Sequence, residues 1–432
     1  MATISIISDF HFGYGTNTER EEDPFIVGKE AFRKAKDSDL IILPGDIFDS
    51  KIPRPEVWAK SMKVLNEGKN SKNDKKCDIL ELRGKDREDI SEQNLRGIPM
   101  VAIHGTHERR GESLINPVEG LEHAGFLIHL HCASILLEVD GDRIGVHGMS
   151  GVPEKYAKEV MVEWDPQPFE NAYNIFMLHQ SIEPYIYSPN NPPSLKLEDL
   201  PTGFDLYVSG HIHWKEKTRV NEKPFIIPGS TVTTQIKKLE SKYNKGFWKI
   251  EDQEKIEFVE LETPRKSYNR SIELNGEGLS EVEDLVKEEL KDILKEDHNK
   301  KPLVRINLQG NIESGLTRSD LDIKKMKDPF KENALITIDK KLQKSKRNEN
   351  VEKLRNIRNE EISVGEMGMK LLHENLEENG SNFNYDDIFQ SLVDGNLETV
   401  LDTILNKKIK KDNKIERDGQ KNKDSNLGKW LQ

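Results

Sequence analysis

The sequence predicts an α/β protein: a β-sandwich flanked by helices, then a small second α/β domain and a helical carboxy-terminal segment. Over roughly the first 260 residues, short apolar runs alternate with turn signals and helical periods, which is typical of packed sheets with helices over them. After Pro264, a strand pattern, an amphipathic helix pattern and another strand pattern follow one another. Such a β-α-β unit is large enough to form a small domain of its own.

The strands expected in the first domain are short and apolar, and helical spacing lies between several of them. One helix is expected from Pro55 through Trp58 to Leu65, and another from Ser113 to Leu121, because their apolar residues recur at three- and four-residue intervals. The expected strands are Thr3–Ser8, Leu40–Leu43, Pro99–Ile103, Ile144–His147, Asn174–Leu178, Leu206–Ser209 and Phe225–Ile227.

In the second domain, the expected helix Leu279–Leu294 lies between the strands Tyr268–Leu274 and Leu303–Leu308. Further along, Val364–Leu376 and Leu397–Leu405 are expected to form amphipathic helices. The charged insertion within the first domain is expected to be a partly helical surface loop. The predicted parts are a first domain at 1–263 with the insertion at 66–97, a second domain at 264–323, a charged linker at 324–361, the amphipathic helices within 362–406, and a basic, disordered tail at 407–432.

Composition and charge limit the function classes. The net charge of -12 lacks the basic footprint of a broad nucleic-acid-binding surface, so any nucleic-acid contact is expected to be local and aided by bound cations. No apolar run reaches the roughly 18 residues of a membrane-spanning helix, and the amino terminus lacks a signal-peptide pattern. Cys77 and Cys132 are the two cysteines and share no motif, which favours a reducing, cytoplasmic setting.

Chemically reactive side chains gather in five short segments, each at or just after the end of an expected strand. Strand ends supply rigid positions at one edge of a sheet, and residues two apart on an extended chain point the same way. Asp9 with His11, and His211 with His213, would therefore each approach an ion from two sides. The segments are Asp9-Phe10-His11, Gly45-Asp46, Gly105-Thr106-His107-Glu108, His179-Gln180 and Gly210-His211-Ile212-His213.

These side chains offer oxygen and nitrogen ligands but no thiolate, which suits Mn²⁺, Fe²⁺ or Zn²⁺ better than Ca²⁺. The carboxylate of Asp46 could bridge two ions, and two cations would polarise a phosphoryl oxygen and lower the pKa of bound water. His107 lies beside the cluster, where an imidazole could protonate a leaving alkoxide. Capping aspartates and packed histidines are the plainer alternative, which explains any one segment better than all five together.

At these residues the chain resembles the calcineurin-like metallophosphoesterases, whose pattern is Asp-x-His, Gly-Asp, Gly-Asn-His-Asp/Glu, His and Gly-His-x-His. Within that superfamily it is similar to the Mre eleven (SbcD) nucleases of double-strand-break repair, and the likeness favours an archaeal member. The likeness is strong in the first domain, moderate in the second and weak beyond. The matching stretches are SDFHFGYG, LPGDIFDSKIPRPEVW, IHGTHERRGES, GVPEKYA, MLHQSIEPY, VSGHIHW and PLVRINLQG.

The resemblance implies a division of the cluster into two metal sites. One metal would be held by Asp9, His11, Asp46 and His213, and the other by Asp46, Thr106, His179 and His211. His107 would be the acid or the transition-state stabiliser. The resemblance further implies two Mn²⁺ ions, 3′-to-5′ exonuclease and single-strand endonuclease activity at DNA ends, a homodimer, and a Rad fifty / SbcC-type ABC ATPase as partner.

One position departs from the family pattern. Thr106 stands where the family usually has Asn, and its hydroxyl is a shorter and weaker ligand than an amide oxygen. We expect the second metal to bind less tightly, or a water to replace the missing reach. The alternatives to an active nuclease are a catalytically weak or inactive scaffold subunit and a phosphodiesterase that acts on small molecules.

Four neighbours of the cluster are expected to support it. Asp49 would hold a ligand or a backbone amide, and Glu108 would orient the adjacent histidine as a carboxylate orients an imidazole. Arg109 and Arg110 would contact phosphate with their planar forks. The plainer interpretations are a turn residue for Asp49 and solvated charges for the other three. His147 matches no ligand position in the family and is expected to be structural.

Two surfaces are expected to bind partners. The helices Val57–Leu65 and Leu114–Leu121 match where the family forms its dimer, although the sequence alone would place them over a sheet. The region 362–406 matches the family's ATPase-docking region in placement, with a small helical subdomain as the alternative. The basic tail would either contact the DNA backbone or only aid solubility.

Overall fold

The computed structural model describes residues 2–70, 76–111, 114–186 and 195–342. Within these residues, two β-sheets form a first domain and a third sheet belongs to a second domain. The predicted sandwich with flanking helices and the predicted second α/β domain are both confirmed. The end of the predicted linker, the helices expected within 362–406 and the tail at 407–432 lie outside the described residues.

The first sheet has the strand order β13-β12-β1-β2-β4-β5. Its central strands run parallel to one another, and β12 and β13 are antiparallel at one edge. Helices α1 (Asp23–Lys34), α2 (Pro55–Lys69) and α4 (Pro117–His123) cover one of its faces. The strands are β1 (Ile4–Ile6), β2 (Leu40–Pro44), β4 (Met100–Ile103), β5 (Ile128–His129), β12 (Gly246–Glu251) and β13 (Lys255–Glu260).

The second sheet has the order β10-β11-β9-β8-β7-β6-β3, and its middle strands β7, β8, β9 and β11 run parallel. Helix α5 (Ala157–Trp164) packs on its outer face. The strands are β3 (Cys77–Arg83), β6 (Ala133–Val139), β7 (Asp142–Met149), β8 (Tyr173–Leu178), β9 (Leu206–Ser209), β10 (Glu216–Val220) and β11 (Lys223–Ile227). The shorter helices of the first domain are α3 (Glu92–Leu95), η1 (Arg87–Asp89), η2 (Glu154–Tyr156), η3 (Leu197–Asp199) and η4 (Glu240–Lys242).

Neighbouring residues of the central strands enter different cores, because side chains alternate between the two faces of a sheet. In β2, Ile42 packs between the two sheets and Ile41 packs under α1 and α2. In β8, Ile175 packs between the sheets and Phe176 packs towards α5. The first domain therefore has four layers, helix, sheet, sheet and helix, and its parallel strands all end at one edge.

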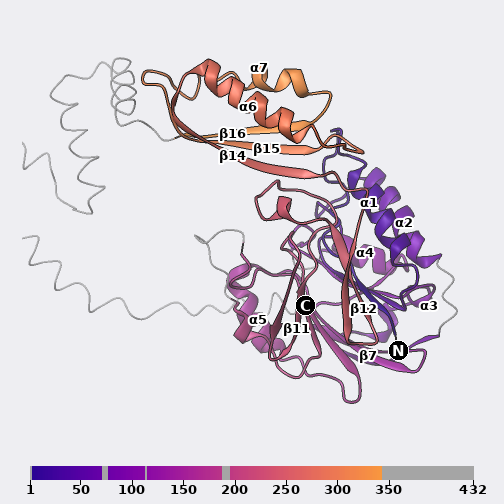
Figure 1. Cartoon of the computed structure of the whole chain (residues 1–432). Helices are drawn as coiled ribbons and strands as arrows, with labels where there is room; N and C mark the ends of the chain where they lie inside the picture. The colour runs from indigo at the N-terminus through magenta and orange to yellow at the C-terminus, as the bar shows by residue number, and fades with distance from the viewer. Residues whose placement is uncertain (1, 71–75, 112–113, 187–194, 343–432) are drawn as a thin grey trace, which may run out of the picture.

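The second domain has its own core. Strands β14 (Ser267–Glu277), β15 (Leu303–Ile312) and β16 (Leu335–Leu342) form a parallel sheet. Helices α6 (Leu279–Ile293) and α7 (Ile323–Lys327), with the short η5 (Asp328–Phe330), complete it. Figure 1 shows α6 and α7 on the face of this sheet that is turned away from the first domain. The expected β-α-β unit is confirmed, and α6 ends one residue before the predicted end.

Polar contacts join the two domains. The guanidinium of Arg265 lies 2.7 Å from the carboxylate of Asp23 in α1, and Lys301 lies 3.0 Å from Glu19. The side-chain amide of Asn269 in β14 donates to the carbonyl of Ile236, at 2.6 Å. A cleft of about 470 Å³ lies between the domains, and residues of both line it.

Part of the charged insertion is not the surface loop that the sequence predicts. Cys77–Arg83 forms β3, an edge strand that pairs antiparallel with β6. Cys77, Ile79 and Leu82 pack against the core between the sheets. A bulge between Ile79 and Glu81 shifts the register, so the apolar alternation breaks midway and the strand pattern is hidden in the sequence.

Two predicted boundaries were also wrong. The expected linker at 324–361 begins inside the second domain, where α7 and β16 continue the fold. β16 is an edge strand, and charged residues are usual there because they discourage pairing with other chains. The helix expected from Ser113 begins at Pro117, because Asn116 caps it by accepting hydrogen bonds from the amides of Val118 and Glu119. No helix among the described residues has both the length and the apolarity to cross a membrane.

Candidate metal centre

The five predicted segments meet at one edge of the sandwich. Asp9 and His11 follow β1, Asp46 follows β2, and Thr106 follows β4 of the first sheet. The segments from the second sheet follow β8 and β9 and carry His179, His211 and His213. Because parallel strands end at a common edge, the two sheets bring these side chains together as the sequence predicts.

The backbone at the site is held in a strained conformation. The φ angles of Asp9, His11, Asp46 and His211 are 52°, 51°, 48° and 81°, in the left-handed region that non-glycine residues seldom adopt. Strain of this kind gathers at functional sites, where the surrounding fold enforces it. Gly105 permits the close packing of these loops, because a Cβ at that position would lie 2.2 Å from Oδ1 of Asp46.

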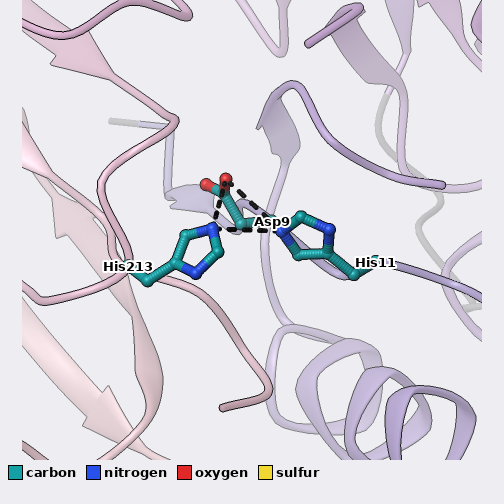
Figure 2. Close-up of side chains that lie close together, drawn as sticks. All are labelled: Asp9, His11 and His213. Atoms are coloured by element: carbon teal, nitrogen blue, oxygen red, sulfur yellow. Dashed lines mark hydrogen bonds and ion pairs between the residues drawn. The ribbon is translucent and has the colours of Figure 1, made fainter. Parts of the chain in front are cut away.

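Asp9, His11 and His213 form the first ligand set. Their donor atoms lie within 4.8 Å of one another, and all three side chains are buried. Nε2 of His213 lies 3.1 Å from Nε2 of His11 and 3.6 Å from Oδ1 of Asp9. Figure 2 shows the two imidazoles pointing towards the carboxylate from opposite sides.

Asp46, His179 and His211 form the second ligand set, again within 4.8 Å. Nε2 of His179 lies 3.1 Å from Oδ2 of Asp46. Asp46 also belongs to a third set with His11 and His107. Asp46 is therefore the one carboxylate placed between the two sets among the described residues, in the position that a bridging ligand needs.

In three of the four histidines of the first and second sets, a polar contact at Nδ1 leaves Nε2 available for a metal. Nδ1 of His179 lies 2.7 Å from the carbonyl of Pro44, which only accepts, so Nδ1 carries the proton. Nδ1 of His11 lies 3.1 Å from the carboxylate of Asp49, and Nδ1 of His213 lies 2.8 Å from Oγ1 of Thr234. Metal-binding histidines usually have such partners, so these residues fit a metal centre.

The charges at the site favour a cation. Burial opposes protonation of His179, yet the carboxylates of Asp46 and Asp9 raise its pKa to about 10. Burial would also raise the pKa of Asp46, but the facing His179 holds that pKa well below its usual value. Burial lowers the pKa of His211 to about 3. In the metal-free protein a proton on His179 thus offsets the carboxylates, and a divalent cation would do the same.

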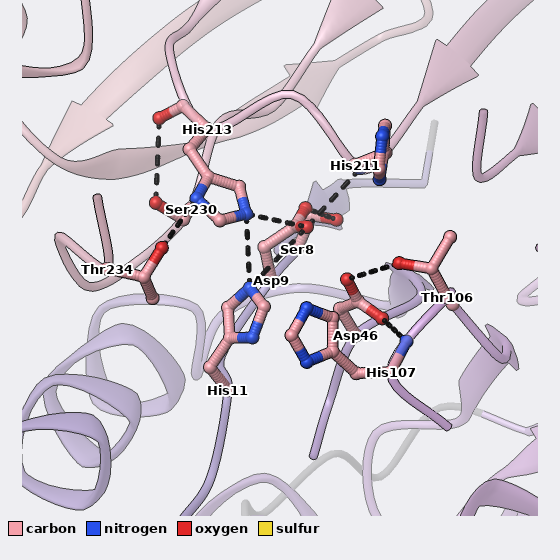
Figure 3. A network of polar contacts seen from close by, with 12 residues as sticks. Ser8, Asp9, His11, Asp46, Thr106, His107, His211, His213, Ser230 and Thr234 are labelled. Atoms are coloured by element: carbon pink, nitrogen blue, oxygen red, sulfur yellow. Dashed lines mark hydrogen bonds and ion pairs between the residues drawn. The ribbon is translucent and has the colours of Figure 1, made fainter. Parts of the chain in front are cut away.

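Thr106 and His107 lie on the exposed side of Asp46. Figure 3 shows the Thr106 hydroxyl and the His107 amide directed at its carboxylate, at 3.4 Å and 2.9 Å. The His107 side chain is 44% exposed, and its Nδ1 lies 3.1 Å from the carbonyl of Asp49. Since a carbonyl only accepts, Nδ1 is protonated and Nε2 is left free to face a substrate.

The supporting residues differ in their roles. Asp49 contacts His11, as predicted for a residue that holds a ligand. Glu108 is fully buried, and instead of the His107 ring its carboxylate accepts the amides of Phe48 and Gly105, each at 2.8 Å. It therefore ties the Asp46 loop to the Thr106 loop. The predicted orienting contact was wrong, because the strand-end turn directs this side chain inwards.

The two predicted arginines are not alike. Arg110 donates to the carbonyl of Ile115, 3.0 Å away, within its own loop. Arg109 is half-buried, and the charge of Glu154 acts on it. His147, predicted to be structural, is buried and lies 2.8 Å from Oγ of Ser134 and 3.0 Å from Oδ1 of Asn174.

Sequence reasoning missed several residues around the site. Thr234 contacts His213, and Lys245 donates to the His213 carbonyl, 3.0 Å away. Lys245 also pairs with the buried Glu240 at 3.0 Å. Glu154 lies 3.8 Å from Nε2 of His211. These residues follow no ligand motif, so only the fold could reveal them.

The sequence also matches a known protein family. Residues 2–215 match the family model described as calcineurin-like phosphoesterase. The chain contains a calcineurin-like metallophosphoesterase domain. The predicted family is confirmed, and the protein is a hydrolase acting on phosphoester bonds.

The similarity of this metallophosphoesterase to curated proteins extends beyond residues 2–215. The chain is similar to "DNA double-strand break repair protein Mre11" of Thermoplasma acidophilum, with 26% identity over 330 residues, 73% of this chain and 78% of that protein. The protein of the same name from Sulfolobus acidocaldarius is 26% identical over 323 residues, 71% of this chain and 74% of the relative. The solved structure of a novel archaeal phosphodiesterase matches at 12% identity with a TM-score of 0.28, covering 60% of this chain and 99% of that chain. So weak a structural likeness supports no further conclusion.

Proposed function

We propose that this protein is a nuclease that hydrolyses phosphodiester bonds at DNA ends in double-strand-break repair. The observation that carries the proposal is the pair of ligand sets joined by Asp46. Relatives named for DNA double-strand break repair match over both domains, which supports DNA as the substrate. By resemblance to such nucleases, the activities are a 3′-to-5′ exonuclease and a single-strand endonuclease.

The cleft between the domains favours DNA over a small substrate. Arg20 and Arg305 line it together with Thr234. Thr234 also contacts Nδ1 of the ligand His213, so the cleft lies behind that ring and borders the metal centre. A strand lying there would meet a guanidinium on each domain, and each guanidinium also pairs with a carboxylate, Arg20 with Asp23 at 3.4 Å and Arg305 with Asp339 at 2.6 Å. This is the feature that speaks against a small-molecule phosphodiesterase.

The metal ions are proposed to be two Mn²⁺, with Fe²⁺ or Zn²⁺ as alternatives, because the ligands are nitrogen and oxygen atoms. Asp9, His11, Asp46 and His213 would hold one ion, and Asp46, Thr106, His179 and His211 the other. When bound, such ions polarise the phosphoryl group and favour ionisation of water.

The protein's own residues complete the chemistry. His107 donates its Nδ1 proton to the Asp49 carbonyl, so Nε2 is the atom that faces the substrate. In the doubly protonated ring, Nε2 would deliver its proton to the leaving alkoxide. Glu108 fixes the loops of Asp46 and Thr106 relative to each other. Arg109 would contact a phosphate at the entrance, and Arg110 shapes its own loop.

A homodimer is part of the proposal. Ile52, Leu114 and Ile115 are 54–66% exposed and lie just before α2 and α4 in the sequence. Leu114 and Ile115 are neighbours in the chain, and exposed large apolar side chains that lie together favour an interface. Analytical ultracentrifugation of the wild type and of the double variant Leu114→Glu/Ile115→Glu tests this interface. We expect the wild type to be a dimer and the double variant to be a monomer. A wild-type monomer at micromolar concentration would refute the interface.

A Rad fifty / SbcC-type ABC ATPase is the proposed partner, docking on the apolar faces within 362–406. Such a complex would work in the cytoplasm, which agrees with the reduced Cys77 and Cys132. Pull-down with the coiled-coil base of the ATPase should succeed with the full chain and fail after truncation at Glu361. Equal binding of both would rule out this docking region.

The direct test of function uses DNA labelled at the 3′ or the 5′ end, with recessed, blunt and single-stranded ends. The full chain should release nucleotides from 3′ ends with Mn²⁺ and should be inactive with EDTA. A chain that binds two Mn²⁺ but cleaves only bis(p-nitrophenyl) phosphate would support the small-molecule alternative. A chain that binds one ion or none and cleaves no DNA would support the scaffold alternative. That alternative arises because Thr106 is a weaker metal ligand than the usual Asn.

A further inference from the structure

We propose that Glu154 is a ligand of the second metal and supplies the oxygen donor that Thr106 supplies poorly. The inference rests on the proposed two-metal function and deepens it. No ligand motif in the sequence includes this residue, which begins the short helix η2 after β7.

Glu154 faces the second ligand set at His211. Its Oε1 lies 3.8 Å from Nε2 of His211, which is too long for a hydrogen bond. Two atoms that each lie about 2.1 Å from one ion are roughly 3–4 Å apart. The separation thus agrees with two ligands of a common ion. The charge of His179, the other histidine of this set, also acts on the Glu154 carboxyl.

The carboxylate is held in place by the loop that carries His179. The amide of Ser181, two residues after His179, donates to Oε1 of Glu154 at 3.2 Å. The Gln180 side chain donates to the carbonyl of Val152 at 3.1 Å. The carboxylate therefore keeps a fixed position next to His211 and against the loop that carries His179, as a ligand position requires.

The same loop packs on the backbone of Thr106. The amide of Gly151 donates to the carbonyl of His104 at 2.7 Å. A Cβ on Gly151 would lie 3.0 Å from the amide nitrogen of Thr106, so only a glycine allows this approach. Glu154 is thus anchored to both loops that carry second-site residues from β4 and β8.

The weak ligand at Thr106 leaves the second metal in need of a stronger oxygen donor, which Glu154 can supply. The Thr106 hydroxyl is neutral and lies 3.4 Å from Oδ2 of Asp46, whereas a carboxylate oxygen brings a full negative charge. Carboxylates suit Mn²⁺ well. Burial raises the pKa of Glu154, and a bound cation would stabilise the carboxylate in that position.

Counting Mn²⁺ on the full-length chain without DNA tests the proposal. Calorimetric titration, with electron paramagnetic resonance of free Mn²⁺, gives the number of ions and their affinities. The wild type should bind two ions. Glu154→Met, which keeps the length but removes both oxygens, should weaken one of them at least about tenfold. Glu159→Met, an exposed change on α5, should bind as the wild type does.

A second substitution separates a ligand from a structural role. Thr106→Asn in the Glu154→Met background supplies an amide oxygen and should restore the lost affinity. Failure of this rescue would overturn the ligand role, and so would unchanged affinities in Glu154→Met alone. A wild-type chain that binds fewer than two ions would overturn both the two-metal site and this role. DNA cleavage by a two-ion wild type with no effect of Glu154→Met would overturn the role of Glu154 only.

Discussion

His11 and His213 face each other with their Nε2 atoms 3.1 Å apart, although 202 positions separate them in the chain. One proton or one ion must lie between two such lone pairs. We therefore expect Mn²⁺ to stabilise the fold by about 2.7 kcal/mol when its concentration is 100-fold above the dissociation constant. Thermal unfolding with and without Mn²⁺ measures this. His213→Leu should lose much of the gain and the exposed His123→Leu should keep it; equal gains in both would contradict a site at His213.

His107→Ala should reduce the rate of DNA cleavage by about 10²–10⁴-fold, as expected for loss of a general acid. The affinity for Mn²⁺ should stay close to that of the wild type, because the ring lies at the exposed edge of the cluster. Single-turnover cleavage and Mn²⁺ titration give the two values. A parallel loss of metal affinity would instead make His107 a ligand with His11 and Asp46.

Lys245→Met should destabilise the protein by about 3–5 kcal/mol, because it removes the lysine charge that pairs with the buried carboxylate of Glu240. Lys245 is buried and bonds to Glu240, Ser230 and the His213 carbonyl. Urea unfolding of the metal-free protein measures the loss. Lys245→Met/Glu240→Gln should recover much of it, and Lys242→Met, at an exposed site, should change stability by less than about 0.5 kcal/mol. No recovery in the double variant would show that the ion pair is not the cause.

His147 should make the protein lose stability in mild acid. Burial lowers its pKa from 6.5 to about 4, so the unfolded chain binds the proton more readily than the folded chain. Stability is then full above pH 6.5 and falls as the pH drops towards 4, by at most about 3 kcal/mol. Urea unfolding from pH 7 to 4 should show a smaller loss for His147→Gln. A slope identical to that of the wild type would exclude His147 as the source.

The part of the site that the sequence predicts consists of residues at the ends of strands. Asp9, Asp46 and His179 each follow an apolar run, and the fold places them where parallel strands end. Residues that approach the site from other parts of the fold could not be predicted from the sequence. Glu154 approaches His211 only because β7 and β9 lie on either side of β8, and no local spacing encodes that.

Some elements of the fold were likewise predictable from the sequence and others were not. Long, regular elements such as α2 and α6 were predicted within a few residues, because their apolar faces repeat without interruption. The strands β3 and β16 were missed because both are edge strands with charged residues, and edges carry a weak pattern. Glu108 was predicted to orient His107 because the two are neighbours in the sequence, whereas the turn after β4 directs the carboxylate inwards and buries it.

The polar contacts between the two domains have a thermodynamic consequence. Each domain has its own apolar core, while Arg265–Asp23 and Lys301–Glu19 are ion pairs. Such a junction transmits little cooperativity, and salt weakens it further. The protein should therefore melt as two units, with separate calorimetric transitions that draw apart as ionic strength rises. A ligand that binds to both domains at once would merge the two transitions into one.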